Sequence, residues 1–178
     1  SSEKDEEIAR KLQQSVGIIK REAQNRIIHQ FDHVNNAKVR KATDIVKKKK
    51  YGEGEVGKAG EQKPGIIFAH NLMAVSGLRD ALKKEGLRVG IIQGSLNGKE
   101  KEKIKNAFNP PSGKSEDREY DVLVLSDAGA TGLNLQNSAY VINYDIPDTD
   151  WVLKQRNGRA DRHGALHPEI DYHNIISD

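Results

Sequence analysis

The chain has 178 residues, no cysteine and a formal net charge of only +3. That length suits one large domain, or one domain with an appendage, and the missing cysteines exclude disulfides and thiolate metal sites. Charged residues make up 31% of the chain and aromatic residues 5%, so the core must be aliphatic and any basic surface must be local. No apolar run reaches membrane-spanning length, and no signal peptide precedes the charged start, so we expect no membrane partner. The abrupt start and the stop at Asp178 suggest a piece of something longer.

Two helices are expected in the first fifty residues. Apolar residues recur every three or four positions from about residue 3 to residue 31, which predicts an amphipathic helix. The stripe consists of Ile8, Leu12, Val16, Ile19, Ala23, Ile27 and Phe31. We expect it to pack on a core, with a coiled-coil partner as the alternative. A break is expected at 34–36, followed by a second helix at 37–49. The lysines at 47–50 fit a cation-rich helix end better than a nuclear signal or a DNA patch.

Residues 51–64 are rich in Gly and Glu and predict a loop that contains a false phosphate-loop match. The stretch from Gly52 to Ala59 nearly follows the pattern G-x-x-x-x-G-K-[ST]. Ala59 lacks the hydroxyl that would bind Mg²⁺, no strand precedes the segment, and the following residues cannot begin a helix. Residues 94–100, GSLNGKE, fail the pattern as well. We therefore expect no phosphate loop in this chain.

From residue 65 onward, short apolar runs alternate with helical patterns. Strands are expected at 65–69, 89–92, 121–125, 140–144 and 172–176, and helices at 73–84, 98–108 and 151–162. Residues 109–120, with two prolines, predict a surface loop. This alternation indicates an α/β fold with a mainly parallel sheet. In such sheets, ligands gather at the loops that leave the carboxyl ends of the strands.

Polar groups suited to phosphate follow three of these strands. The third strand runs into a loop with small residues at 128–130 and Gly132, hydroxyls at Ser126 and Thr131, and the amide of Asn134. Backbone N–H groups at a helix start suit a phosphodiester, whereas the alternative is a tight turn that needs glycine for backbone reasons alone. The other two loops bring His70 with Asn71, and Gly94 with Ser95 beside Lys99 and Lys103.

The last helical segment places three phosphate-binding side chains together. At about 100° per residue, Gln155, Arg159 and Arg162 fall on one face, and Arg156 lies about 100° to one side. An amide and two guanidinium forks suit a phosphate, while the alternative is a solvated basic face. His163 and His167 are four residues apart, a spacing that metal ligands can have, but Pro168 breaks the helix and no third ligand is nearby. We therefore expect no metal site.

Four blocks in order resemble the second RecA-like lobe of a superfamily-two helicase, nearest the Swi/Snf-like DNA translocases of bacterial or phage type. The blocks are GIIFAHN at 65–71 (motif IV), LRVGIIQGSLNGKEKEKIKNAFN at 87–109, DVLVLSDAGATGLNLQ at 121–136 (motif V) and YVINYDIPDTDWVLKQRNGRADRHG at 140–164 (motif VI). The resemblance implies a three-layer RecA-like domain at 37–178 with a mainly parallel sheet flanked by helices. Residues 1–36 would be a helical extension, and the domain stops before the bracing helix of its relatives.

The resemblance also implies roles for the candidate residues. ATP and Mg²⁺ would be held mainly by a first RecA-like lobe, and Arg159 and Arg162 would reach the γ-phosphate as arginine fingers, with Gln155 ordering that side. Gly132 and Asn134 would couple the nucleotide to the nucleic acid. The residues expected at the backbone of double-stranded DNA are Ser126, Gly94, Ser95, Lys99, Lys103, His70 and Asn71. Without a phosphate loop, this chain alone should not hydrolyse ATP.

Two alternatives remain at this stage. The first is an RNA helicase of the DEAD-box kind, although DEAD-box helicases usually have His where Gln155 stands and Asp where Asn134 stands. The motif V loop is also shorter here than in the eukaryotic Swi/Snf-like remodellers. A non-catalytic RecA-like binding module is the other alternative. The implied location is cytoplasmic, at the nucleoid in a bacterium or phage infection, with a nuclear location as the alternative.

Overall fold

The computed structural model describes residues 2–52, 62–70, 72–147, 149–160 and 169–176, without the side chains of 2, 26–36 and 72. The chain forms two compact units, Ser1–Ala37 and Lys38–Asp178. Asn71, Arg162, His163, His167 and the false phosphate-loop match lie wholly or largely outside the described residues.

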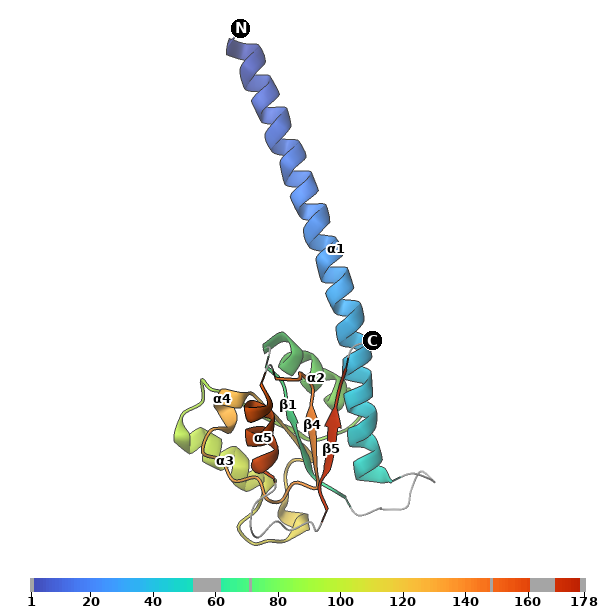
Figure 1. Ribbon diagram of the computed structural model, residues 1–178, viewed down its shortest axis with the longest axis vertical. Coiled ribbons are helices and arrows are strands. Elements are labelled where there is room, and N and C mark those ends of the chain that lie inside the picture. The colour runs from blue at the N-terminus through green and yellow to red at the C-terminus, as the bar shows by residue number, and fades with distance from the viewer. Residues whose placement is uncertain (1, 53–61, 71, 148, 161–168, 177–178) are drawn as a thin grey trace. The chain divides into compact units, whose positions relative to one another are not determined.

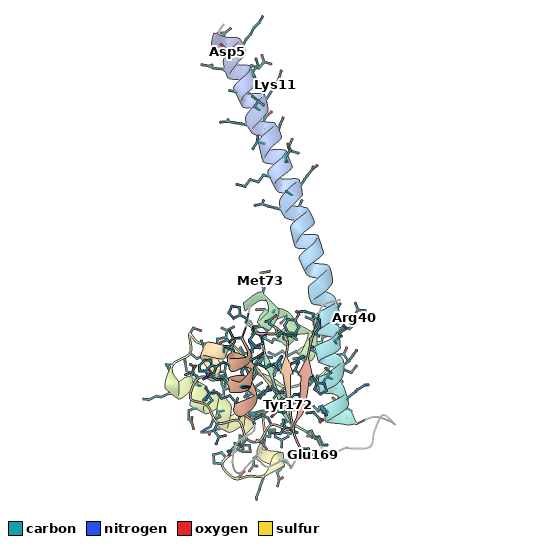
Figure 2. The ribbon with its side chains drawn as sticks, in the orientation of Figure 1. Asp5, Lys11, Arg40, Met73, Glu169 and Tyr172 are labelled. Carbon is teal, nitrogen blue, oxygen red and sulfur yellow. The ribbon has the colours of Figure 1, made fainter. Side chains whose placement is uncertain are left out.

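A single helix, α1, runs from Ser2 to Tyr51 and is drawn as one uninterrupted coil in Figure 1. The predicted break at 34–36 is therefore wrong. The segment contains neither Gly nor Pro, and each Asn costs an α-helix only about 0.7 kcal/mol, which neighbouring turns can absorb. In Figure 2, the labelled side chains Asp5 and Lys11 point outward from this helix.

The apolar stripe of the first unit is not buried. Ile8, Leu12, Val16 and Ile19 are each 56–65% exposed, so the expected packing of these residues on a core is not observed. Ile27 and Phe31 lie among the side chains that the structure does not describe. The coiled-coil alternative stays a prediction.

The second unit is built on a parallel sheet of five strands in the order β2-β3-β1-β4-β5. The strands are β1 (Gly65–Phe68), β2 (Val89–Ile92), β3 (Val122–Leu125), β4 (Tyr140–Asn143) and β5 (Asp171–Asn174). The helices are α2 (Leu72–Lys84), α3 (Gly98–Phe108), α4 (Asp127–Ala130) and α5 (Asp150–Gly158), with a 3₁₀ turn at Ser115–Asp117. Figure 1 shows β1, β4 and β5 side by side.

Alternate side chains of each strand enter two separate cores, as the pleat of a sheet requires. On one face, Ile67, Val124 and Ile142 pack with residues from α1 and α2, including Ala42 and Leu78. On the other face, the cluster contains Ile66, Leu123, Val141, Phe108 and Ala160. The expected three-layer α/β architecture with a parallel sheet is confirmed.

The helix ends follow local rules. Asn97 caps α3, and its side chain accepts from the backbone N–H of Glu100 while Glu100 binds the Asn97 N–H in return. Gly86 follows α2 with φ +76°, a conformation that glycine adopts without strain. The described part of α5 ends at Gly158 with Arg159 as its C-cap, which is earlier than the predicted end at 162.

The lysine run at the end of α1 belongs to the second unit and pairs with acidic side chains of that same unit. Lys50 pairs with Asp121 at 2.8 Å, Lys47 pairs with Glu85 at 2.9 Å, and Lys49 pairs with Asp171. The run is therefore a helix C-terminus, as predicted, and its lysines are held by carboxylates of the second unit.

Asp121 lies at the amino-terminal edge of the sheet with only 5% of its side chain exposed. It accepts hydrogen bonds from Lys50 Nζ, from the Arg88 backbone N–H and from Arg88 Nη2, each at 2.8 Å. Burial by itself would raise the pKa of this carboxyl, but the hydrogen bonds from Arg88 and Lys50 outweigh it and hold the pKa below its ordinary value.

This lowered pKa predicts acid sensitivity. Because the folded pKa lies below the unfolded value of about 3.9, the stabilisation by Asp121 is complete above about pH 4 and is lost as the pH falls through the folded pKa. Urea titrations of the 178-residue chain between neutral and acid pH should show the free energy of unfolding falling at the acid end. Asp121→Asn should flatten that fall; an acid limb equally steep in the variant would contradict the assignment.

Candidate functional site

Four loops leave the carboxyl edge of the sheet at one level. The register pairs Phe68 with both Leu125 and Asn143, and pairs Ile92 with Leu125. The residues that follow these strands therefore start side by side. The sequence had placed its candidate residues at this edge, and the sheet order brings the β1, β3 and β4 loops next to one another.

The β3 loop is held close to β2 by small residues. Ser126 caps α4, because its Oγ accepts from the Gly129 N–H at 3.0 Å. A Cβ at Gly129 would lie 2.3 Å from the Ile92 carbonyl oxygen, and a Cβ at Gly94 would lie 2.9 Å from the Ala128 Cβ. A side chain at Gly94 or Gly129 would therefore clash with its neighbours, so close packing alone explains why both residues are glycine. Ser95 is exposed beside this contact.

The motif V segment turns back toward α5. Gly132 has φ +77°, which strongly favours glycine. Asn134 is exposed, and its Oδ1 accepts from the Gln136 N–H at 3.2 Å, which stabilises its own turn. The next N–H, that of Leu135, donates to the Arg159 carbonyl at 3.1 Å. Gly132 and Asn134 therefore precede a direct backbone link between this segment and the end of α5.

Gln155 and Arg159 line one pocket of about 260 Å³, together with Thr131 and Ala128 of the β3 loop. Gln155 is exposed and Arg159 half-buried. Two of the three side chains predicted on one helical face are thus together in the structure, next to the loop predicted to carry phosphate contacts. The third, Arg162, lies outside the described residues.

Sequence reasoning missed the residue that organises this edge, which is Arg156. Its side chain is 3% exposed, and Nε and Nη2 donate to the two Asp127 carboxylate oxygens at 2.6 and 2.7 Å. Nη1 donates to the Asp145 carbonyl at 2.6 Å, and the guanidinium lies 5.3 Å from the Phe68 ring centroid. The spacing in the sequence could have revealed that Arg156 is buried. Arg156 stands four residues from Val152 and from Ala160, on the apolar side of α5.

A second pocket, of about 490 Å³, shares Asp127, Val152 and Arg156 with the first and adds His70, Ile146 and Pro147. The His70 backbone N–H donates to Asp145 Oδ2 at 2.6 Å, which joins the β1 loop to the β4 loop. His70 is exposed at the rim. The structure therefore places His70 at the same edge as Gln155 and Arg159, on the other side of Arg156.

The two α3 lysines singled out by the sequence lie elsewhere. Lys99 and Lys103 are exposed and line a separate hollow of about 1100 Å³ with Asp117 and Glu119. Instead, Lys101 reaches the β3 loop, where its Nζ lies 3.4 Å from the Ala128 carbonyl oxygen. The helix period, which turns successive residues about 100°, decides which lysine faces the loop.

Metal and membrane features are absent from what the structure describes. Within the described ranges, no group of three or more His, Cys, Asp or Glu residues could hold a metal ion, and His163 and His167 are outside those ranges. Among the helices that are described, none combines the length and apolarity needed to cross a membrane.

Comparison with known proteins identifies the family of this chain. The sequence model "Helicase conserved C-terminal domain" matches residues 37–164. Curated relatives include the DEAD-box ATP-dependent RNA helicase CshB of Bacillus subtilis (strain 168), 28% identical over 101 residues, and the ATP-dependent RNA helicase RhlB of Vibrio vulnificus (strain YJ016), 34% identical over 107 residues. These alignments cover 57% and 60% of this chain but only 22% and 23% of the relatives.

Solved structures show the same fold. The C-terminal part of the Fun30 ATPase domain matches with a TM-score of 0.65 at 19% identity, over 79% of this chain and 41% of that chain. The E. coli DEAD-box protein SrmB, solved bound to regulator of ribonuclease activity A, matches with a TM-score of 0.58 at 20% identity, over 79% of this chain and 72% of that chain.

Proposed function

Because the chain belongs to the family of the helicase conserved C-terminal domain, we propose that it is the second motor lobe of an ATP-dependent enzyme that moves on nucleic acid. A first RecA-like lobe would bind ATP and Mg²⁺, and this lobe would close on the nucleotide. The chain spans less than a quarter of the length of the curated relatives, so the activity of the whole protein belongs to the proposal.

The observation that carries the proposal is the shared pocket of Gln155 and Arg159 beside the β3 loop. A guanidinium at this edge can stabilise the charge that spreads over the γ-phosphate oxygens during transfer. The Leu135 N–H to Arg159 carbonyl bond connects that guanidinium's residue to motif V. Arg162 would add the second charge, and Gln155 would orient the phosphate or the attacking water.

The nucleic acid would lie along the β2 and β3 loops. Gly94 and Ser95 are exposed there, and Ser126 has a hydroxyl proton left to donate to a phosphodiester. Contacts of this kind position the lobe on a backbone without reading the sequence. Movement of two lobes through the ATP cycle would then shift the enzyme along the strand.

Double-stranded DNA is the nucleic acid that we propose first. Gln155 and Asn134 stand where DEAD-box RNA helicases usually have His and Asp, and both residues lie at this edge of the sheet. RNA is the second candidate, and the curated relatives, which are RNA helicases of about 30% identity, favour it.

The deciding experiment compares ATP hydrolysis by the full-length protein with duplex DNA, single-stranded DNA and RNA at equal nucleotide concentration and fixed salt. We expect duplex DNA to stimulate turnover about tenfold or more over the protein alone, as differential binding of one motor state predicts. Equal or greater stimulation by RNA would select the second candidate. Turnover that no nucleic acid changes would contradict both.

A further inference from the structure

Arg156 uses three of the five N–H donors of its buried guanidinium in contacts with Asp127 and Asp145. Two N–H groups bind the Asp127 carboxylate in a two-pronged contact, a third binds the Asp145 carbonyl, and the flat face rests over Phe68. Only 3% of the Arg156 side chain is exposed, against 34% for Asp127. Such a fork holds its partner in one orientation, which a lysine ammonium cannot do.

This pair ties one helix to three strand ends. Arg156 is on α5, the helix that presents Gln155 and Arg159, and its contacts are at the ends of β1, β3 and β4. Asp127 is the first residue of α4, in the loop that carries Ser126 and Gly132. Moving that loop away from α5 would leave a buried positive charge without its carboxylate, so the two must move together.

The pair also forms a wall between two pockets. Arg156, Asp127 and Val152 line both the pocket of about 260 Å³ that holds Gln155 and Arg159 and the pocket of about 490 Å³ rimmed by His70. A displacement of the β3 loop at one pocket would therefore be transmitted to the other pocket through the side chain of Arg156.

We propose that Arg156 is a positioning residue that couples nucleic-acid binding to ATP hydrolysis, by making the β3 loop and the Arg159 end of α5 one rigid element. This inference rests on the proposed function. It assigns to Arg156 no contact with ATP or nucleic acid; the side chain acts through Asp127 on one side and through α5 on the other.

A purely structural role is the competing explanation, and the chain contains a matched control. Arg88 binds Asp121 through Nε and Nη2 and binds the Arg118 carbonyl through Nη1, the same three kinds of contact at the opposite edge of the sheet. Arg88→Gln should reduce stability and leave the ratio of nucleic-acid-stimulated to basal turnover unchanged. Arg156→Gln should reduce that ratio.

The experiment measures ATP turnover of the full-length protein against nucleic-acid concentration for the wild type, Arg156→Gln, Arg156→Lys and Arg88→Gln. We expect the stimulation ratio to fall about tenfold in Arg156→Gln, within the range of about 5- to 150-fold usual for coupled sites, and Arg156→Lys to recover only part of it. Asp127→Asn, which keeps the guanidinium and the side-chain shape, should lower the ratio in the same direction and carries the test if Arg156→Gln does not fold.

Two outcomes would overturn the proposal: a wild-type ratio in Arg156→Lys and Asp127→Asn, or an equal loss of the ratio in Arg88→Gln. Failure of the proposed function looks different, because the wild-type protein would then show no stimulation by any nucleic acid.

Discussion

Replacing Arg159 by alanine in the full-length protein is expected to lower the rate of ATP hydrolysis by about 1,000-fold, the lower end of the range for an arginine finger. Arg159 lines the pocket beside the β3 loop with Gln155, and no neutral side chain there can replace its charge at the γ-phosphate. Steady-state turnover at saturating ATP and nucleic acid measures the effect. Because the interaction would form mainly in the transition state, kcat should fall far more than the affinity for ATP.

The matched control is Arg79→Ala, since Arg79 is on α2 and binds its neighbour Asp80 at 3.0 Å. It should retain turnover within about twofold, because exposed arginines contribute little. Arg159→Lys should lie between the two, with the charge kept and the fork lost. Wild-type turnover in Arg159→Ala would remove this lobe from the hydrolytic site. The 178-residue chain alone should show no turnover, and appreciable hydrolysis that Arg162→Ala abolishes would contradict a separate ATP-binding lobe.

Asp121→Asn should lower the free energy of unfolding by about 3 kcal/mol, because it leaves partly buried cations without their carboxylate. Lys50 and the backbone and side chain of Arg88 all donate to this one side chain. Urea unfolding at neutral pH measures the loss as a lower midpoint at constant slope.

Asp171→Asn is the control for this second variant, because Asp171 pairs with the neighbouring Lys49 but is 56% exposed. Its loss should stay below about 1 kcal/mol, as for other exposed ion pairs. Equal losses in the two variants would show that the burial of Asp121 is not what makes it important.

Strands β1 to β4 were predictable because they are short, apolar and bounded by turn residues. The fifth strand was expected at 172–176, whereas β5 is the polar and largely exposed segment Asp171–Asn174. The run VGII at 89–92 and the helix at 98–108 with its Asn97 cap were predicted with the observed limits. The break in α1 was wrongly predicted, because Asn35 and Asn36 weaken a helix without ending it. The sequence predicted that the strands are mainly parallel, but it did not predict their order. That order depends on how the helices cover the sheet, and no local sequence pattern contains this information.

The sequence predicted which loops form the candidate site better than it predicted which side chains meet there. The positions of Gln155 and Arg159 followed from the helical period alone, whereas the partner of Arg156 is 29 residues away in the chain and depends on packing. A polar residue on an apolar helix face, across from a carboxylate at a strand end, is the signal that reveals such a pair. Lys101 was missed for a related reason, since its neighbours Lys99 and Lys103 have the same chemistry and a different direction.

The strand order also bears on how the chain is made. Of the five strands of this sheet, β1 is the first to leave the ribosome, but it is the middle strand, and its neighbours are β3 and β4. The β2–β3 and β4–β5 pairs join strands that are consecutive in the chain, while β1 gains its second neighbour only when Asn143 has been synthesised. Until then the apolar segment GIIF has open hydrogen-bonding edges, and such segments associate readily between nascent chains. Lys63 and Pro64 directly precede it, a charge and a ring without an N–H of the kind that hinders this association.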